Sequence, residues 1–216
     1  MKRRVWLVVF LGCLTPFLLA LIDVGLGRLG ANPISEITNR TGLWTLRFLL
    51  LSLTVTPLRR LTGWNAIAPY RRTFGLFAFF YVCLHFLTYL VLDQFFAFDL
   101  ILKDVAKRPF ITVGFGSFVL LIPLAVTSTK KMARRLGGKR WKRLHRLVYI
   151  AGVGGVIHYL WLVKADISRP VAYGALLTLL LGARILFFAL DRRKSSRRLK
   201  PVIVRPSAGA LSSDAD

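Results

Sequence analysis

Long apolar runs separated by short, mostly basic blocks are the dominant pattern of this 216-residue chain. A helix of about 20 apolar residues spans the roughly 30 Å hydrocarbon core of a bilayer and satisfies its own backbone hydrogen bonds there. The pattern therefore predicts an all-α, polytopic membrane protein built as a bundle of six transmembrane helices. The predicted spans are residues 5–22, 43–58, 74–92, 110–127, 144–163 and 171–190.

Composition supports a membrane protein over a soluble domain. The chain is 55% hydrophobic and only 19% charged, yet its formal net charge is +23, whereas a soluble domain covers one core with charges of mixed sign. The first span follows three basic residues as a signal peptide would, but its apolar run is long and lacks a convincing cleavage site, so we expect a retained helix. Cys13 and Cys83 fall inside apolar segments, where we expect packing roles rather than a disulfide.

The distribution of basic residues predicts the orientation. The N-terminus, the second and fourth connections and the C-terminal tail carry 22 of the 32 lysines and arginines, against 7 in the other three connections. Because basic residues accumulate in cytoplasmic loops, both termini are expected in the cytoplasm, which requires an even number of spans. Residues 1–192 form the predicted membrane domain, and residues 193–216 a basic, then polar, disordered cytoplasmic tail.

The basic connection KKMARRLGGKRWKRLHR could also suggest nucleic-acid binding. Membrane topology and attraction to anionic lipid head groups account for the same residues, so lipid is the expected partner and nucleic acid is not. The short connections on the opposite side are the part of the chain expected to touch a periplasmic protein, and they contain Asp93, Asp99 and Asp104.

All three histidines of the chain fall in predicted helices, where hydrocarbon penalises ionisable groups and a functional role is the default hypothesis. His85 lies 13 residues after Arg72, and His158 lies 13 residues after His145. Because the third and fifth spans run in the same direction, His85 and His158 are predicted at one depth in the outer half of the membrane. His145 and Arg72 are predicted level with each other near the cytoplasmic face.

Two imidazoles facing each other across a bundle can take both axial positions of a heme iron, which leaves a site for single-electron transfer and no open position for a substrate. His85 and His158 are thus the predicted axial ligands of the iron of a b-type heme. Thirteen residues turn a straight helix by about 220°, so His145 and His158 share a face only if their helix bends. One heme between His85 and His158 is favoured over two stacked hemes.

A basic rim is predicted at the cytoplasmic end, where Arg71, Arg72 and His145 come together beside Tyr70, Trp141, Lys142 and Arg143. Such a rim suits a quinone head group or a flavin phosphate, with His145 as a proton relay or as a ligand of a second heme. Simple anchoring by the positive-inside rule is the competing interpretation of the arginines.

Three segments resemble a known family: TGLWTLRFLLLSLTVTPLRR, YRRTFGLFAFFYVCLHFLTY and GGKRWKRLHRLVYIAGVGGVIHYLW. They are similar to the heme-binding membrane subunits of methionine sulfoxide reductase systems, the MsrQ family, within the ferric reductase-like transmembrane group. The resemblance extends from the first span to Leu190.

The resemblance implies an electron-transfer subunit of the bacterial inner membrane, without catalytic residues of its own. Quinol of the respiratory chain is the implied donor, heme b the carrier, and a periplasmic molybdopterin reductase of the MsrP type the acceptor, for repair of oxidised periplasmic proteins. Carried over onto this chain, the family's heme histidines are His85 and His158, with His145 a further family histidine. FMN is a candidate second cofactor.

Two other functions remain open from the sequence. A ferric or other metal reductase could use the same heme with a different acceptor. A small proton- or metal-coupled transporter is the second alternative, although transporters place acidic residues near the midplane and this chain has only 9 Asp and Glu. A direct NADPH donor is not expected, because the chain lacks a glycine-rich nucleotide fingerprint after a strand.

Overall fold

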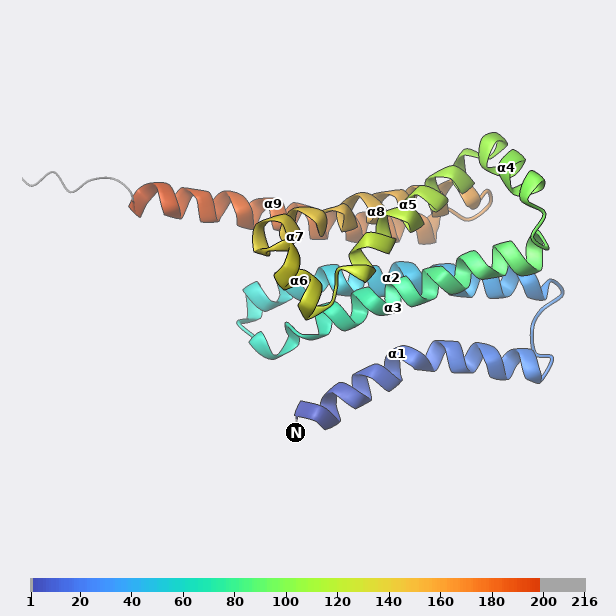
Figure 1. Ribbon diagram of the computed structural model, residues 1–216, viewed down its shortest axis with the longest axis horizontal. Coiled ribbons are helices and arrows are strands. Elements are labelled where there is room, and N and C mark those ends of the chain that lie inside the picture. The colour runs from blue at the N-terminus through green and yellow to red at the C-terminus, as the bar shows by residue number, and fades with distance from the viewer. Residues whose placement is uncertain (1, 199–216) are drawn as a thin grey trace, which may run out of the picture.

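The computed structural model describes residues 2–198, and within that range every regular element is a helix. The long helices run side by side along one axis (Figure 1). They are α1 (Lys2–Gly25), α2 (Pro33–Thr62), α3 (Tyr70–Leu87), α5 (Pro109–Val126), α8 (Leu147–Leu162) and α9 (Ser168–Arg198). The short elements are the 3-10 turn η1 (Asn65–Ile67), the π-helical η2 (Thr88–Asp93), α4 (Phe98–Lys107), α6 (Lys130–Leu136) and α7 (Gly138–Leu144).

The predicted all-α membrane fold is confirmed, with differences at the segment ends. Five segments among residues 2–198 are long and apolar enough to cross a membrane, and they correspond to α1, α2, α3 with the flanking η1 and η2, α5 and the first part of α9. The remaining predicted span corresponds to α8, which has 16 residues and is about 24 Å long. The count of six spans and the cytoplasmic placement of both ends stay predictions, although α1 begins and α9 ends at the same end of the bundle (Figure 1). Helix α9 continues through residue 198, and residues 199–216 of the predicted tail lie outside the described range.

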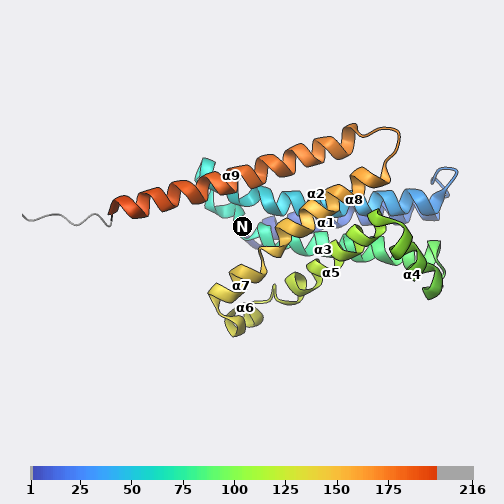
Figure 2. The ribbon, with the colours of Figure 1, turned by 90° about the horizontal axis from the view of Figure 1, so that it is seen from above.

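Two antiparallel helix pairs form the centre of the bundle. Helix α2 packs along α3, and α5 packs along α8, while α9 lies against α2 and α8 on the flank away from α5 (Figure 2). The main core cluster is rich in aromatic side chains, with Phe48 of α2 stacked on Tyr81 of α3 at 5.3 Å between ring centroids. Each helix pair contributes one of the two outer histidines, so their meeting point lies between the pairs.

Two prolines lie inside helices, and beside each one a side chain from another helix forms hydrogen bonds with the backbone. Pro16 bends α1, and the Tyr81 hydroxyl bridges the neighbouring backbone groups: it accepts from the Phe17 N–H at 3.0 Å and donates to the Cys13 carbonyl at 3.0 Å. Pro57 of α2 has no N–H to offer the carbonyl of Leu53 one turn earlier. Arg184 of α9 donates to that carbonyl at 2.8 Å. Both contacts fasten peripheral helices to the central pairs.

The cysteines behave as packing residues. Cys13 is buried in the main core cluster, Cys83 is half-buried, and both are free thiols.

Candidate heme-ligand pair and cytoplasmic-end pocket

His85 and His158 lie next to each other, in agreement with their predicted equal depth. Their ring centroids are 6.1 Å apart and the ring planes meet at 80°. Metal–imidazole bonds are about 2 Å long, so the ring centres of two imidazoles on opposite sides of one metal lie about 6 Å apart. An ordinary edge-to-face aromatic pair has a similar spacing. The hydrogen bonds of the two rings distinguish these cases.

Each of the two rings is held by a backbone carbonyl through the same nitrogen. Nδ1 of His85 lies 2.9 Å from the carbonyl oxygen of Thr38 on α2. Nδ1 of His158 lies 2.6 Å from the carbonyl oxygen of Phe110 on α5. A carbonyl only accepts, so both Nδ1 atoms carry the proton and both Nε2 atoms keep a free lone pair. Metal-binding histidines are held in this way, with the second nitrogen oriented by a carbonyl or carboxylate.

A glycine one turn after each carbonyl makes room for the ring. A Cβ on Gly42 of α2 would lie 3.1 Å from Cε1 and 3.2 Å from Nδ1 of His85. A Cβ on Gly114 of α5 would lie 2.6 Å from Nδ1 and 2.9 Å from Cε1 of His158. The same local design therefore occurs twice, once in each helix pair.

The chemistry of this donor set fits a heme better than a bare metal ion. Among residues 2–198, three or more His, Cys, Asp or Glu side chains nowhere gather closely enough to hold a metal. Two imidazoles alone are too few for the usual four-coordinate protein sites, whereas a porphyrin brings four nitrogens and needs only axial ligands.

His145 lies at the other end of the bundle and not in a span. The sequence predicted one helix over 144–163, but α7 ends at Leu144 and α8 begins at Leu147, with His145 capping α7. Tertiary contacts explain the break: the indole N–H of Trp141 donates to the Thr127 carbonyl at 3.0 Å, and the Trp141 and His145 rings stack at 4.0 Å between centroids. The placement of all three histidines in helices was therefore wrong for His145.

The hydrogen bonds of His145 differ from those of the outer pair. Its Nε2 lies 3.2 Å from the hydroxyl of Thr127, which itself donates to the Pro123 carbonyl at 2.6 Å. The hydroxyl therefore accepts from Nε2–H, which leaves Nδ1 of His145 as the free acceptor. His145, in the break between α7 and α8, and His158, within α8, therefore belong to different sites.

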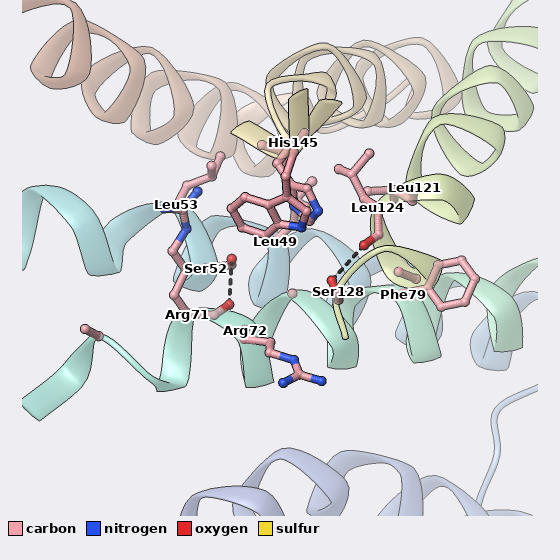
Figure 3. Close-up of a pocket in the computed structure, with 15 residues that line it drawn as sticks. Leu49, Ser52, Leu53, Arg71, Arg72, Phe79, Leu121, Leu124, Ser128 and His145 are labelled. Atoms are coloured by element: carbon pink, nitrogen blue, oxygen red, sulfur yellow. Dashed lines mark hydrogen bonds between the residues drawn. The ribbon is translucent and has the colours of Figure 1, made fainter. Parts of the chain in front are cut away.

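A pocket of about 250 Å³ lies beside His145. Arg71 and Arg72 from α3 line it together with Trp141 and His145, so the structure brings these predicted residues together. The Arg71 side chain extends towards Leu53, whereas the Arg72 guanidinium points away from His145 (Figure 3). Tyr70, Lys142 and Arg143 of the predicted rim are not among the lining residues.

The charged side chains that line the pocket are positive. None of the fifteen described residues that line it carries a carboxylate, and its two serines use their hydroxyls on backbone carbonyls (Figure 3). Ser52 donates to Arg71 at 3.0 Å and Ser128 donates to Leu124 at 2.7 Å. Leucines and Phe79 form its apolar wall. It suits a flat, acceptor-rich or anionic group.

Comparison with known proteins decides the family. The family described as ferric reductase like transmembrane component matches residues 41–156, which include His85 and His145. Three relatives carry the name protein-methionine-sulfoxide reductase heme-binding subunit MsrQ. The protein from Herminiimonas arsenicoxydans is 51% identical over 89% of this chain and 88% of its own length. The protein from Rhodospirillum rubrum is 53% identical over 88% and 91%, and that from Ralstonia nicotianae is 51% identical over 85% of both.

This chain belongs to the MsrQ family. No solved structure matches it. The MsrQ relatives are named for binding heme, and the residues of this chain that fit that group are His85 and His158. The sequence pointed to these two residues but missed their supports, the carbonyls of Thr38 and Phe110 and the glycines at 42 and 114. The signal available in the sequence was the presence of Gly42 and Gly114 in or beside two apolar segments, since a glycine there leaves room for a side chain from another helix.

Proposed function

We propose that this chain is the heme-binding membrane subunit of a methionine sulfoxide reductase system of the bacterial inner membrane. It takes electrons from the quinone pool of the respiratory chain and passes them to a periplasmic molybdopterin reductase of the MsrP type. The observation that carries the proposal is the His85–His158 pair with both Nδ1 atoms tied to carbonyls. The names of the MsrQ relatives support it.

The residues around the pair hold and orient the cofactor. A heme held by His85 and His158 would supply reversible one-electron transfer. The carbonyls of Thr38 and Phe110 accept from the Nδ1–H of each ring, which fixes the tautomer and leaves both Nε2 lone pairs available to bind a heme iron. Gly42 and Gly114 let the rings approach the helix backbones closely.

The pocket at the opposite end is the proposed quinol site. The pocket volume of about 250 Å³ accommodates a ring-sized head group, and the apolar wall of the pocket suits a membrane-dissolved molecule. His145 offers a free Nδ1 that can accept a proton released as quinol is oxidised, and Thr127 holds the ring in place. FMN is the alternative occupant, with Arg71 as the partner for its phosphate.

Quinol-dependent reduction of the purified protein in lipid nanodiscs tests this function. Anaerobic addition of a short-chain quinol should reduce the heme, followed through its α and Soret bands. His145→Leu should slow that reduction about a hundredfold, the usual contribution of a general base, while dithionite still reduces the heme. Arg134→Gln on α6, outside the pocket, is the matched control.

Two outcomes would contradict the quinol assignment. One is a heme that dithionite reduces and quinol does not. The other is a His145→Leu protein that reacts with quinol at the wild-type rate. The acceptor is tested separately by mixing the quinol-reduced protein with a purified periplasmic molybdopterin reductase. The reductase should reoxidise the heme continuously only when methionine sulfoxide is supplied as its substrate.

A further inference from the structure

Helix α4 lies across the end of the bundle that carries the histidine pair. It runs crosswise to the long helices, between the end of η2 and the start of α5 (Figure 1). The sequence predicted only a connection there, because ten residues with four charges do not form an apolar span. It lies at the end of the bundle where α3 ends and α5 begins.

One side of α4 packs on the protein through a cluster of polar contacts. Asp104 pairs with Arg108 at 3.4 Å and accepts from the Tyr89 hydroxyl at 3.4 Å and from the side-chain amide of Gln94 at 3.4 Å. Ile101 and Val105 are half-buried on the same side. Because Tyr89 lies in η2, which begins three residues after His85, these contacts connect α4 to the histidine pair.

A second side of α4 exposes large apolar side chains. Phe98 is 65% exposed and Leu102, one turn later, is 68% exposed. Phe95, in the turn just before the helix, is 77% exposed and has a left-handed backbone with φ of 47°. Asp99 and Lys103 are each one residue further along, about 100° around the helix, and are also exposed. Phe98 and Leu102 thus form an apolar strip beside the charged strip of Asp99 and Lys103, while Leu100, which is 54% exposed, lies beyond the charged strip.

The apolar side continues the lipid-facing surface of the bundle. Helix α5 begins two residues after α4 ends. Its large exposed hydrophobic side chains are Phe115, Val119, Ile122 and Val126, and the polar Thr112 is exposed near its start. In a protein that crosses the membrane this surface meets acyl chains. Helices with one apolar and one charged side that lie in the membrane plane bury their apolar side about 5–10 Å into the head-group and acyl boundary, and aromatic residues favour this depth.

We propose that α4 is an in-plane membrane anchor, with Phe95, Phe98 and Leu102 inserted in lipid and Asp99 and Lys103 in water. Lipid is the partner because α4 leads within two residues into α5, whose large exposed side chains are apolar, and because Asp99 and Lys103 lie about 100° around the helix from Phe98 and Leu102. Through Asp104 and Tyr89 the anchor fixes how deep the His85–His158 pair lies below the membrane surface. This inference is independent of the proposed quinol and reductase partners.

Spin-label accessibility in lipid nanodiscs tests the anchor on the whole protein. Single cysteines replace Phe98, Leu102, Asp99 or Lys103 in a Cys13→Ala, Cys83→Ala background, and each carries a nitroxide. Labels at positions 98 and 102 should collide at least about threefold more with oxygen, which concentrates in lipid, than with a water-soluble nickel chelate. Labels at positions 99 and 103 should show the reverse preference.

Equal, water-like accessibility at all four positions would overturn the proposal. So would labels at positions 98 and 102 that lie in water and become protected only when a periplasmic reductase is added, because the apolar side would then be a protein-docking surface. If the cysteine-free background does not fold, Phe98→Trp and Asp99→Trp in the wild-type chain replace it. Brominated lipid should then quench the added fluorescence of the first and not of the second.

Discussion

Gly114 of α5 touches the ring of His158 so closely that a Cβ at this position would lie 2.6 Å from Nδ1. The contact follows from the hydrogen bond of that nitrogen to Phe110, one helical turn earlier. The ring that reaches the Phe110 carbonyl lies over Gly114, four residues later, where the missing side chain leaves space for it. Gly42 has the same relation to His85, with more room.

Gly114→Ala should therefore displace His158 and weaken heme binding. Adding a methyl group to a tightly packed site costs about 1–3 kcal/mol, which corresponds to heme binding weaker by a factor of about 5 to 160. Heme per polypeptide after detergent extraction is the measurement. Gly116→Ala on the same helix is the control, because a Cβ there meets nothing within 4 Å. Equal loss of heme in both variants, or in neither, would contradict the role given to Gly114.

Tyr81→Phe should loosen α1. The hydroxyl joins the Phe17 N–H to the Cys13 carbonyl beside the Pro16 bend, and its loss leaves both backbone groups without that partner. Leaving such groups unsatisfied costs about 1–3 kcal/mol. Thermal unfolding in detergent micelles should show a lower midpoint than for Tyr70→Phe, the same change on the same helix at a hydroxyl without a hydrogen bond in the described structure. Equal midpoints for the two variants would show that the bridge contributes nothing.

Arg184→Met should separate α9 from the centre of the bundle. Arg184 donates to the Leu53 carbonyl at 2.8 Å and to the Tyr149 hydroxyl at 2.6 Å. The loss should lower the free energy of unfolding by about 1–3 kcal/mol. The Leu53 carbonyl depends on Arg184 because residue 57 is proline and has no N–H. The loss of stability caused by Arg184→Met should therefore be smaller in a Pro57→Ala background, where a backbone N–H is restored.

A double-mutant cycle with these two substitutions measures the coupling. Residues that share a partner show interaction energies of about 0.5–3 kcal/mol. Additive effects of Arg184→Met and Pro57→Ala would mean that the arginine stabilises the bundle only through Tyr149 or by packing.

Sequence patterns predicted the long apolar helices of the bundle, because membrane helices are set by apolar length. The apolar run 43–58 became α2, yet the helix begins at Pro33 and so includes Thr38, whose carbonyl holds His85. The start was visible in the sequence: Asn32 caps the helix by accepting from the Ser35 N–H, and proline follows at the first helical position. A scan for apolar residues alone passes over this polar first part.

Other features of the site depend on tertiary contacts that the sequence does not display. The stretch around His145 contains no proline or glycine to mark a break, and the break arises where Trp141 reaches the Thr127 carbonyl. The level of His85 with His158 followed from counting residues, but their orientation depends on carbonyls of two other helices. Helix α4 was missed because it is amphipathic and short.

The low-spin heme signal in electron paramagnetic resonance, measured together with heme per polypeptide, tests the His85–His158 pair most directly. His85→Ala and His158→Ala should each abolish the signal of two axial imidazoles, because either loss leaves the iron with one protein ligand. His145→Ala should keep that signal. If both His85→Ala and His158→Ala retain the wild-type signal and heme content, the pair does not bind the iron and the proposed electron path is wrong.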